Sequence, residues 1–261
     1  MSYNPHIATS FSHAASRYDQ VAFLQREIGE ILFSLVKKLN KTPKNILDLG
    51  AGTGFFSQYL ASHYTNTNIF SLDKAVGMSH YNQSKHPHPS LHTLCADAFH
   101  LPLTSQSIDC LFSNLMIQWC HDLSAALKEC QRILSKNGSI FISTLGKETL
   151  NELHKSWQQA FGYRLSVDFL SAEQFKNSLK EAGFYPLQLE KYNLCLNYLT
   201  VKDLLDELSQ LGAGNIRNTN KSGLLGRKSF QLFNTYYEQY RSEDGFLPAT
   251  YEVIYYHGRL K

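Results

Sequence analysis

The feature that most constrains the fold is residues 45–54, a short apolar run that ends in an acid and a cluster of glycines. Residues 55–60 then take up helical spacing, so the segment predicts a strand, a tight turn and a helix. Gly50, Gly52 and Gly54 allow positive φ and a close approach of the backbone to a bound group. Because the new helix also offers unpaired N–H groups there, the pattern predicts a ligand site at the end of the strand.

The glycine spacing separates two nucleotide-type ligands. A dinucleotide fingerprint requires Gly or Ala at the last place of Gly-x-Gly-x-x-Gly. Counting from Gly50, that place is Phe55, which disfavours NAD. The string is instead similar to the Asp-x-Gly-x-Gly-x-Gly pattern of S-adenosylmethionine (SAM) methyltransferases. This resemblance implies that the glycine backbone holds the aminoacyl tail of SAM and that Asp48 meets its ammonium group. The alternative is a glycine-rich βα turn without a ligand.

Two further strand ends converge on the same site. Asp73 ends a second short strand and follows Gly54 by about the 20 residues expected for a carboxylate that accepts the ribose hydroxyls. Its alternative role is to cap the next helix. Asp97 and Ala98 follow a third strand, and the resemblance to SAM methyltransferases implies that this turn lies beside the adenine. There a carboxylate can accept from the amino group, and a backbone N–H can donate to the ring.

Residues 45–144 alternate between short strands and helices, which predicts a doubly wound, mostly parallel sheet of Rossmann-like type. Residues 107–114 read as its fourth strand and are nearly all apolar, as a central parallel strand should be. Asn114, Gln118 and Trp119 stand at the carboxyl end of this strand. Ligands bind at that edge in open α/β folds, so these side chains are candidates for the site.

The segments outside this core have different patterns. Residues 1–19 open with polar, turn-like sequence that leads into residues 11–19, and residues 21–39 predict an amphipathic helix packed on the domain. In the first segment, Phe11 and Tyr18 either pack under this helix or belong to a lid over the ligand site. Helices over 148–161, 171–182, 201–211 and 230–240 are expected to form a cap, and strands over 187–198 and 251–256 the antiparallel edge of a seven-stranded sheet. We therefore expect a single methyltransferase domain over 1–261, with N-terminal helices or a lid (1–44), a SAM-binding core (45–145), and cap helices with the sheet edge (146–261).

Composition argues against several classes of function. The formal net charge of the 261-residue chain is +3 and no Lys/Arg block stands out, so nucleic-acid binding has little support. No apolar run approaches the ~18 residues of a membrane span, and the chain does not open like a signal peptide. We expect a cytoplasmic, monomeric enzyme that does not bind membranes. The five cysteines contain no Cys-x-x-Cys, and no His-Glu-x-x-His occurs, which disfavours disulfides and a metal site.

A set of motifs spans nearly the whole chain. The most specific is Ser-Asn-Leu-Met-Ile-Gln-Trp-Cys at residues 113–120. The others are Phe11-x-x-Ala14-Ala15-x-x-Tyr18, the glycine motif at 48–54, Leu101-Pro102-Leu103, Glu152-Leu153-His154-x-x-Trp157, Gly212-Ala213 and Pro248-Ala249-Thr250-Tyr251. Together they resemble the malonyl-acyl-carrier-protein O-methyltransferases of biotin synthesis (BioC). That family often carries Arg before the Phe-Leu that is 169–170 here, whereas this chain has Asp168, with Arg164 as a possible substitute.

The resemblance implies methyl transfer from SAM to the free carboxyl of malonyl carried on an acyl carrier protein, an early step of biotin synthesis. A malonyl carboxylate is already ionised at pH 7, so the reaction needs no strong base and no metal. The residues expected to bind the cofactor are Asp48, Gly50, Ala51, Gly52, Gly54, Asp73, Asp97, Ala98 and Asn114. Those expected at the methyl-transfer pocket are Tyr18, Gln118 and Trp119. Candidates to meet the acidic carrier protein, unless they are only solvated surface, are Arg217, Lys221, Arg227 and Lys228.

Two other functions fit the same motifs. One is a SAM-dependent methyltransferase that acts on another acceptor, such as a small carboxylic acid or a quinone precursor. The other is a SAM-fold protein that serves as an assembly factor or hydroxylates a protein partner.

Overall fold

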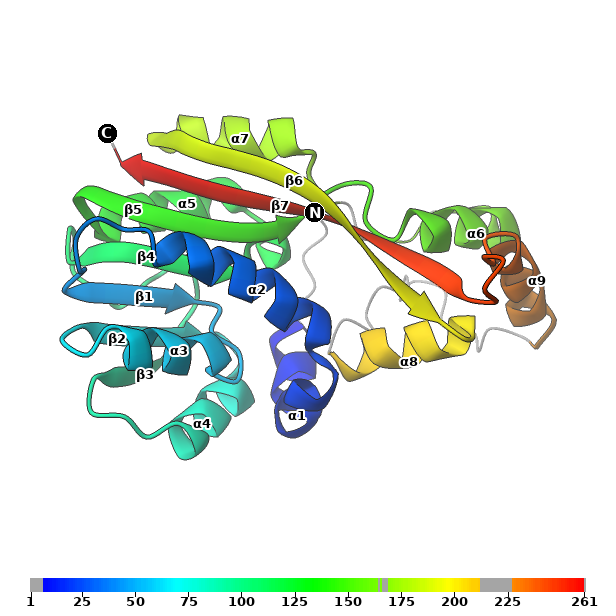
Figure 1. Ribbon diagram of the computed structural model, residues 1–261, viewed down its shortest axis with the longest axis horizontal. Coiled ribbons are helices and arrows are strands. Elements are labelled where there is room, and N and C mark those ends of the chain that lie inside the picture. The colour runs from blue at the N-terminus through cyan, green and yellow to red at the C-terminus, as the bar shows by residue number, and fades with distance from the viewer. Residues whose placement is uncertain (1–6, 164, 166–168, 212–226, 261) are drawn as a thin grey trace.

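The computed structural model describes residues 7–163, 165, 169–211 and 227–260. Its centre is a seven-stranded sheet with the strand order β3-β2-β1-β4-β5-β7-β6 (Figure 1). The first five strands along the chain are parallel, and β7 runs antiparallel between β5 and β6, so the predicted doubly wound, mostly parallel sheet is confirmed. The strands are β1 (Asn45–Leu49), β2 (Asn68–Asp73), β3 (Leu91–Cys95), β4 (Ile108–Asn114), β5 (Leu134–Leu145), β6 (Phe184–Tyr198) and β7 (Leu247–Leu260).

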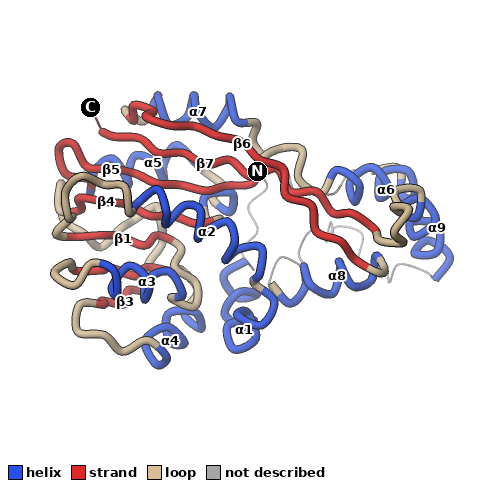
Figure 2. The backbone as a smooth tube through the Cα atoms, viewed as in Figure 1, coloured by secondary structure: helices blue, strands red, loops and turns tan. Residues whose placement is uncertain are grey.

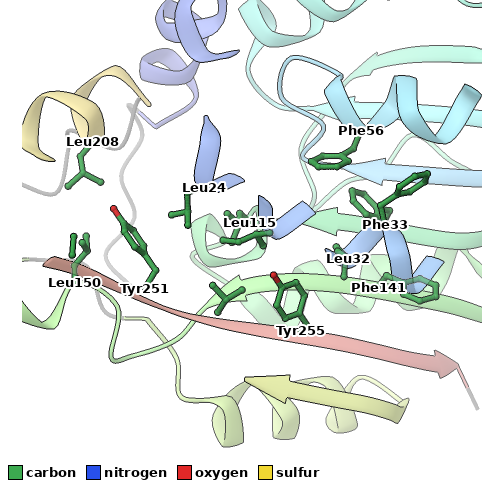
Figure 3. Packing of buried hydrophobic residues seen from close by; sticks show 14 of the residues in the cluster. Leu24, Leu32, Phe33, Phe56, Leu115, Phe141, Leu150, Leu208, Tyr251 and Tyr255 are labelled. Carbon is green, nitrogen blue, oxygen red and sulfur yellow. The ribbon is translucent and has the colours of Figure 1, made fainter. Parts of the chain in front are cut away.

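Both faces of the sheet are covered by helices, as Figure 2 shows. On one face, α2 (Phe23–Val36) and α3 (Phe55–His63) share a buried apolar cluster with the sheet. On the other, α5 (Leu123–Ile133) and α7 (Ala172–Glu181) share a second cluster. Successive strand residues alternate between the clusters, since side chains of a strand point to opposite faces. In Figure 3, side chains of α2 meet those of β5 and β7 across the first cluster.

The last two strands extend beyond the rest of the sheet. Pairing of β7 with β5 ends where Val253 faces Leu145, whereas its pairing with β6 continues to Leu247 opposite Tyr198. The sheet thus narrows to two strands there, and α6, α8 and α9 pack around the projecting pair (Figure 1). The other helix expected in the cap, α7, instead packs against β6 and α5 on the face of the sheet. These helices are α6 (Asn151–Phe161), α8 (Val201–Gln210) and α9 (Arg227–Glu238).

The N-terminal segment contains two helices, α2 and, before it, α1 (Ile7–Val21), which packs against α4 (Val76–Lys85). The polar residues before Phe11 were expected to be turn-like, but those from Ile7 onward are helical. The contact with α4 is close, because a Cβ added to Gly77 would lie 2.5 Å from the carbonyl oxygen of Ser12. The Gly77 N–H also donates to the Ser12 hydroxyl, 3.2 Å away. Tertiary contact with α4 therefore stabilises a helix whose own apolar pattern is weak.

Two other helices show which contacts determine where a helix begins. α7 begins after Ser171 as predicted, and its capping box pairs Ser171 with Gln174. The helix expected from residue 148 begins only at Asn151, because Leu150 has a left-handed backbone (φ 53°) and its N–H donates to the Thr250 carbonyl of β7 (2.6 Å). Within the described ranges, no helix is both long and apolar enough to cross a membrane.

Neighbouring residues of α2 allow a test of this packing. Leu32 is fully buried against the sheet, whereas Ile31 is 41% exposed. We expect Leu32→Ala to lower the free energy of unfolding by about 2–5 kcal/mol, because it leaves a cavity in the apolar cluster. Ile31→Ala should change it by no more than about 0.5 kcal/mol. Urea unfolding of both variants measures the difference, and equal losses would contradict the packing of α2.

Candidate active site

The glycine turn after β1 needs its three glycines for different reasons. All three have positive φ, 77° at Gly50, 56° at Gly52 and 85° at Gly54. A Cβ added to Gly50 would lie 2.1 Å from Cγ of Met116, and one added to Gly54 would lie 2.0 Å from Oδ1 of Asn82. A Cβ at Gly52 would meet nothing within 4 Å. The two outer glycines thus make room for side chains of the protein, and the middle one faces open space.

Two carboxylates flank this turn at the ends of β1 and β2. Asp48 is 2% exposed, and its Oδ2 accepts a hydrogen bond from the Ser57 hydroxyl (2.5 Å). Burial raises the pKa of Asp48 to about 7; the Ser57 hydrogen bond lowers it and the charge of Asp73 raises it. In Asp73, Oδ2 accepts from Gly52 N–H (2.9 Å) and Oδ1 from Ala75 N–H (2.7 Å). Burial raises the pKa of Asp73 against these hydrogen bonds, so the site suits a ligand that brings positive charge and donors.

The third predicted strand end lies at the turn after β3. Asp97 Oδ2 pairs with Lys74 Nζ at 2.6 Å, and Oδ1 accepts from the Phe99 N–H at 3.2 Å. Burial raises the pKa of Asp97, but the hydrogen bonds from Lys74 and the Phe99 N–H, together with nearby positive charge, outweigh it and leave the pKa below its usual value. Ala98 is buried beside it. Both oxygens of Asp97 are therefore already engaged within the protein.

At the end of β4 the chain turns sharply. Leu115 has a φ of 54°, an uncommon conformation for a bulky residue, and its N–H donates to the Ser143 carbonyl (3.0 Å). Asn114 donates from Nδ2 to the Gln25 carbonyl (2.8 Å) and accepts at Oδ1 from the Ser143 hydroxyl (2.6 Å). The Asn114 side chain thus joins α2, β4 and β5, and its amide is used to hold the scaffold.

The turn leads into η1 (Ile117–Trp119), a short 3₁₀ helix that carries another predicted residue. Oε1 of Gln118 accepts a hydrogen bond from the hydroxyl of Thr144, 3.1 Å away near the end of β5. Thr144 itself is 4% exposed. This contact engages the amide oxygen of Gln118, which leaves its NH₂ group as the donor available to a ligand.

Helix α1 connects the remaining predicted residues. Phe11 contacts Trp119 edge to face, with ring centroids 5.5 Å apart, and lies 6.3 Å from the ring of Tyr18. Burial raises the pKa of Tyr18, and the negative charges of Asp73 and Asp19 raise it further. Tyr18 therefore keeps a protonated hydroxyl near the end of β2. The structure brings Tyr18 and Trp119 into one aromatic cluster through Phe11, which the sequence left either in the core or in a lid.

A second contact of α1 reaches the glycine turn, and sequence reasoning missed it. Thr53, inside the turn, donates its hydroxyl proton to Asp19 Oδ1 (2.8 Å). Arg26 Nη2 donates to the Asp19 carbonyl oxygen (2.6 Å) and lies 3.6 Å from Asp19 Oδ1. The guanidinium also lies 4.6 Å above the ring of Phe55. Asp19 is 34 residues from Thr53 along the chain, so no local pattern could have paired them.

The residues considered for the malonyl carboxylate and the carrier protein are mostly not described by the structure. Arg164, Asp168, Arg217 and Lys221 lie outside the described residues. Arg227 and Lys228 begin α9.

The strand order, the single reversed strand and the glycine turn after β1 define a class I, Rossmann-like methyltransferase. A family model described as a methyltransferase domain matches residues 47–142. Among solved structures, the chain is similar to the YcgJ protein of Bacillus subtilis, with a TM-score of 0.64 and 14% sequence identity. That similarity covers 89% of this chain and 98% of YcgJ, and it supports the fold.

Relatives at higher identity define the family. The chain is 36% identical to the malonyl-[acyl-carrier protein] O-methyltransferase of Methylovorus sp. (strain MP688), over 96% of this chain and 87% of that protein. It therefore belongs to the malonyl-[acyl-carrier protein] O-methyltransferase family. It is also 39% identical to the biotin biosynthesis bifunctional protein BioHC of Cellvibrio japonicus, over 95% of this chain. The chain spans 49% of that bifunctional relative.

Because Gly52 faces open space and Gly54 contacts Asn82, we expect their substitutions to lower the free energy of unfolding by different amounts. Gly52→Ala and Gly54→Ala both place a Cβ at positive φ, which costs roughly 1–2 kcal/mol. Only Gly54→Ala also collides with Asn82, and we expect this overpacking to remove a further ~1–3 kcal/mol of unfolding free energy. Chemical denaturation of the two variants isolates the difference. Equal destabilisation would show that Asn82 does not require glycine at position 54.

Proposed function

We propose that this protein transfers the methyl group of SAM to the free carboxyl of malonyl carried on an acyl carrier protein, and so forms the methyl ester. One observation carries the proposal: Gly52, where an added Cβ would meet nothing within 4 Å, donates its N–H to Asp73, whose charge acts on the buried Asp48, in a chain similar along 96% of its length to the Methylovorus malonyl-[acyl-carrier protein] O-methyltransferase.

The residues at the strand ends suit SAM. Asp48 would receive the ammonium group, since a positive charge offsets the cost of a buried carboxylate. Asp73 accepts backbone hydrogen bonds from Gly52 on Oδ2, from Ala75 on Oδ1 and from Lys74, and its carboxylate would accept from a ribose hydroxyl beside them. Gly52 would let the backbone approach the aminoacyl tail. When bound, SAM supplies an electrophilic methyl group on a positively charged sulfur.

The chain has to orient the acceptor and exclude water. A malonyl carboxylate is ionised at pH 7, so no residue needs to remove a proton from it. Tyr18, with its raised pKa, and Gln118, with its NH₂ group available, are neutral donors that can orient the acid. Phe11 and Trp119 form an apolar cover over this end of the sheet. Alignment of two bound reactants can contribute up to ~7–11 kcal/mol to lowering the barrier.

Methyl transfer tests the proposal directly. The protein is incubated with methyl-labelled SAM and malonyl-acyl carrier protein, and we expect label on the carrier protein as a base-labile ester. Acetyl-acyl carrier protein is the matched control, because it has the same thioester and no free carboxyl. Label that appears only on another acceptor would reject the proposed substrate. Binding of SAM without any transfer, together with co-purification of a large partner, would favour an assembly factor.

A variant of Gln118 tests how the acceptor is held. We expect Gln118→Leu to raise the KM for malonyl-acyl carrier protein about tenfold or more, because a hydrogen bond to a charged group contributes ~1.5–3 kcal/mol. The affinity for SAM should not change. Gln58→Leu, at an exposed position of α3, is the matched control. An unchanged KM in steady-state kinetics would remove Gln118 from the acceptor site.

A further inference from the structure

A chain of buried polar side chains runs beneath the glycine turn and ends at Asp48. The Asn82 amide Nδ2 lies 2.5 Å from the Ser71 hydroxyl oxygen, which is 2.7 Å from that of Ser57, which is 2.5 Å from Asp48 Oδ2. None of the four residues is more than 2% exposed. They come from α4, β2, α3 and β1, so four consecutive elements of the core meet in one hydrogen-bonded chain.

The proton count determines the direction of this chain. An ionised Asp48 can only accept, so Ser57 must use its single hydroxyl proton on Asp48. Ser57 then has no proton left for Ser71, and Ser71 must donate to Ser57. Ser71 in turn needs a donor, and the Asn82 NH₂ group supplies it. Every link therefore points toward Asp48, and the arrangement favours its carboxylate form because a hydrogen bond to the charged form stabilises that form.

Asn82 itself has a constrained position. Its Oδ1 is buried without a hydrogen-bond partner and lies where a Cβ of residue 54 would otherwise be. A buried amide oxygen without a partner is unfavourable. Gly54 makes room for this amide, and the outcome is an NH₂ group directed at Ser71.

We propose that Asn82 and Ser71 are positioning residues of the methyl-donor site, which act through Ser57 to hold Asp48 as the carboxylate that receives the ammonium group of SAM. The proposal rests on the proposed use of SAM but not on the identity of the acceptor. Neither Asn82 nor Ser71 is required to touch the ligand.

Other charged groups at this end of the sheet need to be separated from Asp48. Asp73 of β2 raises the pKa of Asp48 and has a raised pKa of its own. On α1, burial raises the pKa of Tyr18, and the charges of Asp73 and Asp19 both raise it further. From β4, Phe112 pairs with Asp48 and cannot titrate. A ligand without an aminoacyl tail would still contact Asp73 but not Asp48. The pH dependence of its affinity therefore reflects the neighbouring groups and leaves out Asp48.

The experiment compares two ligands across pH. S-adenosylhomocysteine has the ammonium group, and 5′-methylthioadenosine lacks the aminoacyl tail. Calorimetry from pH 5.5 to 8.5 should show the affinity for S-adenosylhomocysteine, relative to 5′-methylthioadenosine, falling as pH drops through about 7, where Asp48 gains its proton. We expect Ser71→Ala and Asn82→Ala to move this midpoint upward by about one pH unit, a roughly tenfold rise in proton affinity.

Controls separate this effect from misfolding. Ser71→Thr keeps the hydroxyl and should retain the wild-type midpoint. Normal affinity for 5′-methylthioadenosine shows that a variant is folded, and titration of the ligand's own amino group cancels when a variant is compared with wild type. An unchanged midpoint in both alanine variants, or an equal shift with both ligands, would overturn the proposal. If the wild-type protein bound neither ligand, the proposed use of SAM would fail as well, whereas methylation of a different acceptor would leave the inference intact.

Discussion

The site depends on keeping two carboxyl groups away from water at the ends of neighbouring parallel strands. Burial raises the pKa of Asp48 to about 7 and raises that of Asp73, so each charge is unfavourable in the folded protein until donors surround it. For Asp48 this affects stability in a defined direction. Its contribution is full below the pKa of an unfolded aspartate, about 3.9, and is lost as pH rises through about 7. Stability lost near neutral pH is what a ligand with positive charge can restore.

The glycine turn shows what a motif can and cannot predict. Its spacing was enough to predict a strand, a turn and a helix, because positive φ at three positions favours glycine whatever surrounds it. The motif could not distinguish Gly52, which faces open space, from Gly50 and Gly54, which accommodate Met116 and Asn82. That distinction depends on side chains contributed by the turn after β4 and by α4, and long-range packing of this kind leaves no local signal.

The same limit explains the rest of the fold. Strands buried on both faces have continuous apolar runs, which made β1 and β4 predictable from the sequence, whereas the edge strand β6 was predicted from its mostly alternating pattern. The start of helix α1 could not, since its packing depends on the contact of Ser12 with Gly77. The position of Asp97 at a strand end was predictable, but its engagement by Lys74 was not. The sequence pattern predicts where along a strand a side chain lies, but only the packed structure shows which residue binds it.

Helix α1 links the two halves of the site. Asp19 joins it to the glycine turn through Thr53, and Phe11 joins it to the exit of β4 through Trp119. The helix also packs against α4, which carries Asn82, and against α8 of the cap. Any displacement of α1 would therefore expose Tyr18 and release Thr53 at the same time. Because one helix contacts the turn, the β4 exit and the cap, it joins the proposed acceptor side to the proposed methyl-donor side by direct contact.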